Sequence, residues 1–540
     1  MKTTLQSLSI HATLICAALL LWGGGPFGHA QELEEIPDDV LQLGETNGNL
    51  EVTPAYSEIR TTTDTTTVSK FHFSGSSAPT GTVQFTGSAG AVINVGTMNV
   101  EQSFTNNIDL NGVSLNIQNM TNDTYGKINS SEPTKTTPTY SITNTSETLS
   151  TVSITRSEYS RLHANYQDAN RASINGNIQL VINPVTSYPS TSDVPVEYRN
   201  MYDRVYLWGD NTYTGGTVVT GYEYEGVYNT TLHAVASSLG TGDLTLRNFA
   251  TLMNAKQSDT YTNNIILDGG GILRVGGEYT MVFTGVISGT GDLYLNYNEA
   301  NGGDIVLAGN NTFDGDTHLC GYLSTTQQGK GSDYTVHVQN DNAFSSGDII
   351  FNSAADERQY QVTLELDNPG GTRIITNNID VSFQKATFTK SEGTLEAIIG
   401  GQLTGESVSM VVNNGVNFQI DLDNWVLPSD GEFLYMWDMK GTLEFQSATT
   451  FSILTSDLSQ YSGQRIYLAQ TDNVIGKENI QIDLSQAEGD GEWEQGVDPE
   501  KGFYIQFTAN PPKPVETPEP ASGLLMLLGL LLAFRRRQPK

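Results

Sequence analysis

Short phrases recur along the middle of this chain, and their repetition constrains the fold more than any other feature. Leu207–Thr217 (LWGDNTYTGGT) returns 100 residues later as Leu307–Thr317 (LAGNNTFDGDT). The phrase Thr-Asn-Asn-Ile occurs three times, beginning at residues 105, 262 and 376. A chain built of repeated short units favours a solenoid, in which each unit packs only against its neighbours.

A second phrase, Gly-Asp followed by apolar-x-apolar, supplies the physical interpretation. It occupies Gly242–Leu246, Gly291–Leu295, Gly303–Leu307 and Gly347–Phe351. Gly-Asp is typical of turns, so we expect Gly242 and Gly291 to adopt positive φ. Alternation places two side chains on the inner face of each strand. The expected inward pairs are Leu244 with Leu246, Leu293 with Leu295, and Ile305 with Leu307.

Such a unit cannot bury its apolar face alone, but stacked units bury a continuous core. We expect coils of about 20–25 residues that rise about 4.8 Å each. The Asn side chains at recurrent turns are expected to stack in ladders along the coil axis.

Composition agrees with a β-rich chain and excludes one class of partner. Only 16% of the 540 residues are charged and 54 are Gly, which disfavours helices. The formal net charge of -33 excludes sequence-independent nucleic-acid binding, which requires clustered Lys and Arg.

Three of these phrases resemble autotransporter-associated β-strand repeats. They are Gly209–Thr217 (GDNTYTGGT), Ala236–Leu246 (ASSLGTGDLTL) and Phe283–Leu295 (FTGVISGTGDLYL). The resemblance is clear over residues 200–320 and fainter elsewhere. It implies a right-handed parallel β-helix that projects from a bacterial surface.

The first thirty residues have the pattern of a secretory signal peptide. Lys2 provides the positive start, residues 12–22 form an apolar run, and Gly28-His29-Ala30 places small residues before the cut. We therefore expect cleavage between Ala30 and Gln31 by the secretion machinery. Maturation would leave Cys320 as the one cysteine, which excludes an intramolecular disulfide and predicts a small buried side chain.

The C-terminal residues 518–540 combine three features in a fixed order. Pro518, Glu519 and Pro520 precede an apolar stretch, residues 521–534, and the basic residues Arg535, Arg536 and Arg537 follow it. This arrangement resembles the PEP-CTERM sorting signal. The resemblance implies transient anchoring in the inner membrane of a Gram-negative bacterium, processing by an exosortase-type enzyme, and release to the surface or matrix. The alternative is a permanent anchor, but fourteen helical residues span only about 21 Å of a hydrocarbon core of about 30 Å.

Between these signals the chain divides by composition. Residues 31–70 are acidic and Thr-rich and are expected to be a linker or a loosely ordered first coil. Residues 71–424 are expected to form the solenoid, and residues 511–517 a stiff Pro-rich spacer. Residues 425–510 are rich in aromatic side chains and are expected to form antiparallel strands that cap the last coil, because an open end exposes core and strand edges. The expected fold is thus all-β: a right-handed parallel β-helix with a C-terminal antiparallel cap.

Searches for catalytic and metal-binding motifs predict no catalytic residue, cofactor or metal site. The five histidines outside the signal are not at ligand spacing from one another, and each is expected on a strand face or turn: His72, His163, His233, His318 and His337. Asp421–Asn424 begins like a calcium-binding loop, but Trp425 occupies a ligand position, so we interpret it as a strand. Calcium is expected only as a weakly bound counterion of the acidic surface, because no loop has a calcium-binding motif.

The sequence therefore predicts an exported, non-catalytic protein of the cell surface or extracellular matrix, structural or adhesive in role. Extracellular polysaccharide or host glycan is the expected class of ligand. One alternative is a polysaccharide hydrolase or lyase on a β-helix scaffold, which would require charged side chains converging in one groove. Another is a simple membrane-anchored binding module.

Overall fold

The computed structural model describes most of the chain between its predicted export and sorting signals. The described residues are 36–75, 81–100, 104, 106–118, 120–121, 140–155, 172–183, 204–207, 210–224, 227–254, 257–297, 302–320, 333–351, 361–381, 385–401, 403–423, 437–470, 473–487, 491–498 and 502–510.

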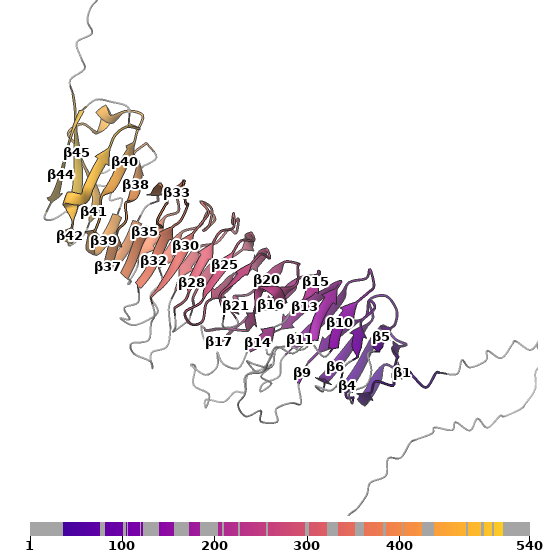
Figure 1. The fold of residues 1–540 in the computed structure, drawn as a ribbon. Helices are drawn as coiled ribbons and strands as arrows, with labels where there is room; N and C mark the ends of the chain where they lie inside the picture. The colour runs from indigo at the N-terminus through magenta and orange to yellow at the C-terminus, as the bar shows by residue number, and fades with distance from the viewer. Residues whose placement is uncertain are drawn as a thin grey trace, which may run out of the picture. The chain divides into compact units, whose positions relative to one another are not determined.

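The described residues between 39 and 510 form mainly parallel β-sheets, in which strands of successive coils lie side by side (Figure 1). One sheet contains β1 (Val40–Leu43), β3 (Glu58–Thr61), β5 (Thr82–Thr86), β7 (Asn107–Asp109), β10 (Tyr140–Asn144), β12 (Ala172–Gly176) and β15 (Thr212–Tyr213). A second contains β2 (Thr46–Val52), β4 (Thr65–Phe73), β6 (Val92–Val100), β8 (Ser114–Ile117), β9 (Met120–Thr121), β11 (Ser150–Thr155), β13 (Ile178–Asn183), β16 (Thr217–Thr220), β20 (Leu244–Arg247), β23 (Ile265–Asp268) and β26 (Ile287–Thr290).

The longest sheet extends to the end of the described chain. Its first part contains β14 (Arg204–Leu207), β19 (Thr231–Ala234), β21 (Ala250–Asn254), β22 (Asp259–Tyr261), β24 (Gly271–Arg274), β25 (Thr280–Phe283), β27 (Leu293–Leu295), β28 (Asp304–Leu307), β29 (Thr317–Leu319), β30 (Tyr334–Val338) and β31 (Ile349–Phe351). It continues through β32 (Gln361–Leu366), β34 (Ile379–Val381), β35 (Lys385–Lys390), β37 (Leu403–Val412), β39 (Trp437–Phe445), β41 (Arg465–Gln470), β42 (Asn473–Ile475), β44 (Gly491–Asp498) and β45 (Gly502–Ala509).

Shorter elements complete the described chain. A further parallel sheet contains β33 (Thr372–Ile375), β36 (Glu396–Ile399), β38 (Val416–Asp421), β40 (Thr449–Leu454) and β43 (Ile480–Asp483), and a hairpin joins β17 (Tyr222–Tyr224) to β18 (Val227–Asn229). Three short 3-10 helices, η1 (Ala236–Leu239), η2 (Leu458–Tyr461) and η3 (Lys477–Asn479), are the helices of the described residues. The prediction of an all-β chain is confirmed.

Strand pairing shows how successive coils stack. Leu244 pairs in parallel with Ile265, 21 residues later, and Ile265 pairs with Ile287. Farther along, Thr317 pairs with Ile349, 32 residues later. The expected coil length therefore holds for some coils and is exceeded in others, because connections between strands vary in length.

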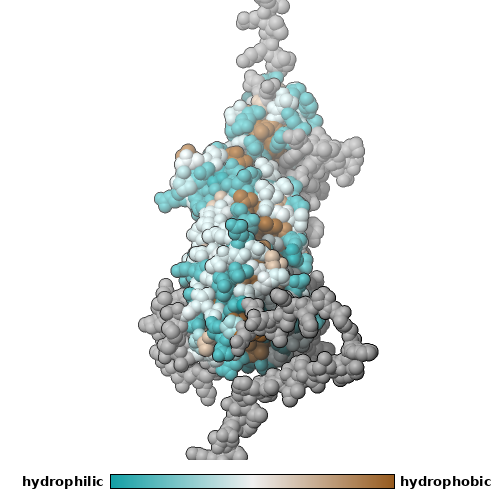
Figure 2. Space-filling model, turned by 90° about the vertical axis from the view of Figure 1, so that its right-hand side faces the viewer, coloured by the Kyte–Doolittle hydropathy of each residue, from teal (hydrophilic) through white to brown (hydrophobic). Residues whose placement is uncertain are grey.

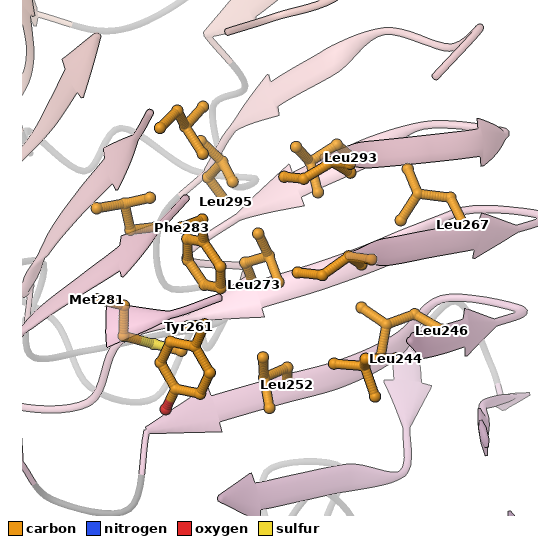
Figure 3. Packing of buried hydrophobic residues seen from close by; sticks show 14 of the residues in the cluster. Leu244, Leu246, Leu252, Tyr261, Leu267, Leu273, Met281, Phe283, Leu293 and Leu295 are labelled. Carbon is orange, nitrogen blue, oxygen red and sulfur yellow. The ribbon is translucent and has the colours of Figure 1, made fainter. Parts of the chain in front are cut away.

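One continuous hydrophobic core lies between the sheets, as the alternating phrases predicted. The six expected inward side chains are each at most 1% exposed: Leu244, Leu246, Leu293, Leu295, Ile305 and Leu307. Figure 3 shows Leu252, Leu273 and Leu295, which pair in register on β21, β24 and β27, lying one above another. The same buried cluster runs from Leu43 to Phe507.

The expected role of one turn glycine is wrong. Gly291 has φ of 90°, as predicted, but Gly242 is not among the residues with positive φ. A Cβ atom on Gly242 would instead lie 2.5 Å from the Gly216 nitrogen and 2.6 Å from the Thr214 oxygen of the preceding coil. Glycine is required here because two backbones approach closely.

Of the two alternatives for residues 31–70, the structure fits a first coil rather than a linker over residues 40–70. Residues 40–70 supply strands β1, β2 and β3 and most of β4, and Leu43 and Val52 are fully buried. The Thr61 and Thr66 hydroxyls hydrogen-bond to each other in the interior. β-branched Thr suits strands, so a Thr-rich segment needs few aliphatic residues to enter a sheet.

Within residues 425–510, fewer strands pair antiparallel than predicted. β44 pairs antiparallel with β45, and β45 with β41, but β39, β40, β42 and β43 continue the parallel pairing. Alternating aromatic residues fit either orientation equally, so their pattern does not distinguish the two.

Candidate functional site

The two recurrent phrases meet on adjacent coils. The Asn263 side-chain amide donates to the carbonyl oxygens of Gly242 at 2.7 Å and Gly240 at 3.2 Å. Its neighbour Asn264 donates to Oδ1 of Asp243 at 3.2 Å. A Thr-Asn-Asn-Ile phrase therefore holds the Gly-Asp turn of the coil before it.

The same contacts recur about a hundred residues later in the chain. Asn377 donates to the carbonyl oxygens of Gly347 at 2.6 Å and Ser345 at 3.1 Å, and Asn378 donates to Oδ1 of Asp348 at 3.1 Å. In the remaining copy Asn107 differs, because its Oδ1 accepts from the Ser141 hydroxyl at 2.8 Å. Two of the three phrases are thus equivalent in structure as well as in sequence.

The pair of phrases that begin at Leu207 and Leu307 also share one role. Asn211 accepts from the Ile174 nitrogen at 2.9 Å and donates to the Ser238 oxygen at 2.7 Å. Asn311 accepts from the Ile287 nitrogen at 2.8 Å and donates to the Ala343 oxygen at 2.7 Å. Each amide therefore joins the coil before it to the coil after it.

These contacts refine the predicted Asn ladders. The recurrent amides bind mainly backbone groups of adjacent coils rather than one another. Direct amide–amide hydrogen bonds do occur, from Asn116 to Asn94 at 2.9 Å and from Asn342 to Asn310 at 2.8 Å.

Three aspartates occupy one turn position on consecutive coils. Asp292, Asp316 and Asp348 directly precede β27, β29 and β31, whose first residues pair in register. Oδ1 of Asp292 accepts from the Asp316 nitrogen at 3.0 Å, and Oδ1 of Asp316 accepts from the Asp348 nitrogen at 2.8 Å. We call these three residues the aspartate column. Each of these hydrogen bonds ties one coil to the next but leaves like charges stacked.

His318 lies beside the aspartate column, on the outward face of β29. Its ring stacks on Tyr294 of the preceding coil, with centroids 4.2 Å apart and an interplanar angle of 5°. Nε2 of His318 lies 3.4 Å from Oδ2 of Asp292. Ligand atoms of Asp292, Asp316 and His318 all lie within 4.8 Å of one another, so these residues bring one imidazole and two carboxylates together.

An aromatic cluster outside the main core supports this histidine. Tyr294 makes edge-on contacts with Phe249 at 5.4 Å and Tyr297 at 5.7 Å, measured between ring centroids. Phe249 adopts φ of 57°, and its ring occupies the space that a Cβ atom on Gly270 would need. Cys320 lies in the same cluster, where burial raises the pKa of its thiol, and the prediction of a small buried side chain is confirmed.

A second histidine has carboxylates on both sides along the sheet. Nε2 of His337 lies 4.0 Å from Oδ2 of Asp304, and Nδ1 lies 3.7 Å from Oε2 of Glu365. Asp304, and then Glu365, raises the pKa of His337 against the opposing effect of burial, while His337 lowers the pKa of Asp304. These groups form an ion pair when the imidazole is protonated.

The expected strand positions of the histidines are confirmed for the four that the structure describes. His72, His233, His318 and His337 lie on β4, β19, β29 and β30, and His163 falls outside the described residues. Ligand spacing within a short segment does not reveal the convergence of His318 with two aspartates, because Asp292 lies on the preceding coil. The available signal was the Gly-Asp pair at 315–316, which follows the pair at 291–292 by one coil.

The other candidate residues are placed as follows. Asp421 ends β38, and the Thr455 hydroxyl and the Ser456 N–H lower the pKa of Asp423 in the following turn. Outside the described residues lie Ala30, Gln31, Pro518, Glu519, Pro520, Arg535, Arg536 and Arg537. No helix within the described ranges is long and apolar enough to cross a membrane.

Comparison with known proteins adds no assignment. No family model, curated protein or solved structure matches this chain.

Proposed function

We propose that this chain is an exported, non-catalytic solenoid of the bacterial surface or extracellular matrix, with a structural or adhesive role. Its fold in this proposal is a right-handed parallel β-helix, with β44 and β45 closing the C-terminal end. The PEP-CTERM-like tail, residues 518–540, directs its sorting through an exosortase-type enzyme in a Gram-negative cell.

One observation carries the non-catalytic part of this proposal. The most regular sequence features are engaged in joining coils: Asn263 and Asn377 hold turn carbonyls, and Asn211 and Asn311 bridge three coils each. A repeat whose polar side chains are occupied by neighbouring backbones suits a scaffold, because stability then accumulates along the stack. The need to keep these contacts between coils explains why the Asn-containing phrases recur, and no catalytic role is required to explain them.

The surface also supports a scaffold or adhesive role. Figure 2 shows a face on which hydrophilic and neutral residues predominate and hydrophobic residues form small separate groups. Among described residues, the large exposed hydrophobic side chains include Leu395 at 70%, Val497 at 47% and Ile475 at 45% exposure. These positions are separate in sequence, and the acidic chain suits contact with neutral polysaccharide or cationic surfaces rather than polyanions.

A binding and turnover assay distinguishes the proposal from the enzyme alternative. The purified full chain is applied to an array of neutral, acidic and host-type glycans, and the same polysaccharides are monitored for reducing ends and unsaturated products. Retention on a glycan without product supports an adhesive scaffold. Catalytic release of either product overturns the non-catalytic proposal in favour of a hydrolase or lyase.

Sorting is tested separately through the basic end of the tail. Replacing Arg535, Arg536 and Arg537 with Ala removes the charge that retains the tail on the cytoplasmic side, so processing and surface delivery should fall. The matched control replaces all three with Lys and should sort normally. Equal delivery of the Ala variant and the unchanged chain, measured by cell fractionation in a bacterium with an exosortase, contradicts the sorting role.

A further inference from the structure

We infer that Asp292, Asp316 and His318 form a binding site for a divalent transition-metal ion of the Zn²⁺ class. This site is independent of the proposed scaffold function and was not predicted by any sequence motif. It takes two residues of the aspartate column and the adjacent histidine of β29.

The donor set selects the class of metal. One imidazole nitrogen and two carboxylate oxygens are ligands that Zn²⁺ accepts, with water able to complete the coordination. Ca²⁺ takes oxygen ligands, and an imidazole in the set therefore disfavours it. The weak calcium binding expected for the acidic surface would therefore not take place at this cluster, whose imidazole favours Zn²⁺.

The separation between the His318 and Asp292 ligand atoms agrees with shared coordination of one ion. Two ligands bonded at about 2.0–2.1 Å in tetrahedral geometry lie roughly 3.3 Å apart. Nε2 of His318 and Oδ2 of Asp292 are 3.4 Å apart, which is longer than the 2.7–2.9 Å of a typical charge-assisted hydrogen bond. Asp316 contributes a third ligand atom within 4.8 Å of the other two.

Neighbouring coils hold the ligands in place. Stacking on Tyr294 fixes the plane of the His318 ring. Backbone N–H groups of Asp316 and Asp348 bind Oδ1 of Asp292 and Asp316, so each carboxylate is oriented while its second oxygen remains a potential ligand. Such outer contacts are a general feature of metal sites, because they reduce the cost of ordering the ligands.

Electrostatics provides the driving force. The aspartate column places carboxylates at one turn position on three successive coils, about 4.8 Å apart by strand spacing. Like charges at that distance repel, and a bound dication offsets the repulsion between Asp292 and Asp316. Metal binding should therefore stabilise the coils of β27 and β29 specifically.

Zn²⁺ binding to the purified full chain tests the inference. Isothermal titration should show a saturable site that weakens at least about tenfold in Asp316→Asn and in His318→Phe. Asn retains an oxygen that accepts from the Asp348 nitrogen, and Phe retains a ring that stacks on Tyr294, so both variants preserve the fold. Ca²⁺ at the same concentrations should not occupy the site.

The matched control is Asp243→Asn, which removes one charge from an equivalent turn whose oxygen accepts from Asn264. It should leave Zn²⁺ affinity unchanged within about twofold, a difference well below the ligand effect. Hydrogen exchange provides a second measurement, since Zn²⁺ should protect β27 and β29 of the unaltered chain. Equal affinity in all variants, or no saturable site and no protection in the unaltered chain, overturns the inference.

Discussion

Gly242→Ala tests how closely the coils approach one another. The added methyl would lie 2.5 Å from the Gly216 nitrogen and 2.6 Å from the Thr214 oxygen, so one backbone must shift. Overpacking of this kind costs about 1–3 kcal/mol. The shift would also disturb the 2.7 Å hydrogen bond that Asn263 donates to the Gly242 oxygen, which contributes about 1 kcal/mol. We therefore expect a local destabilisation of about 2–4 kcal/mol.

Gly48→Ala is the matched control for this prediction. Gly48 lies within β2, and a Cβ atom there meets nothing within 4 Å. Its φ is not positive, so Ala should be neutral or stabilise by about 0.4–1 kcal/mol through the unfolded chain. The same chemical change is thus expected to destabilise the chain at residue 242 and not at residue 48.

Native-state hydrogen exchange measures both effects, because it reports opening at each coil separately. Protection should fall in β16, β20 and β23 of Gly242→Ala and stay unchanged in β37 and β38, which lie many coils away. A Gly242→Ala protein as protected as Gly48→Ala would refute the close-approach explanation. Loss of protection throughout the chain would refute the premise that coils depend mainly on their neighbours.

Further predictions concern the core and the pH response. Leu244→Asp places an unpaired charge at a side chain that is 1% exposed, so the coil should open locally. Limited proteolysis should then cut within about two coils around residue 244. Release of an intact fragment of about 100–150 residues would instead indicate a globular domain. The raised pKa of His337 predicts an ion-pair contribution to stability that is full below pH about 6.5 and is lost as pH rises through the folded-state pKa. Protection of β28, β30 and β32 should fall over that range, and His337→Gln should abolish the change; persistence in the variant contradicts the assignment.

The sequence predicts the interior of this fold well, because alternation acts within one strand. Leu244 and Leu246 are two residues apart and necessarily share a face of β20. The position of Asn263 against Gly242 is harder to foresee, since it depends on the length of the connection between them. That separation is 21 residues in one copy and 30 for the equivalent pair Asn377 and Gly347.

The same limitation explains the missed metal ligands. Asp316 and His318 are close in sequence, but Asp292 joins them only once the register of β27 and β29 is known. Local motif searches assume that ligands lie on one turn or helix, whereas a solenoid brings together residues one coil apart. Strand orientation in β39 and β40 was missed for a related reason, because pairing partners rather than composition decide it.

Register also shows what distinguishes a structural turn from a candidate site. Asp243 is followed at the same turn position by Asn264, and Asp348 by Asn378, so a neutral amide donates to each carboxylate. Asp292 is followed by another aspartate, which provides only a backbone N–H. An Asp in place of the Asn therefore preserves a hydrogen bond between the coils and adds a negative charge. In a repeat protein of this kind, a binding site is most readily found at a turn that keeps the backbone geometry of the neighbouring coils but carries a different charge.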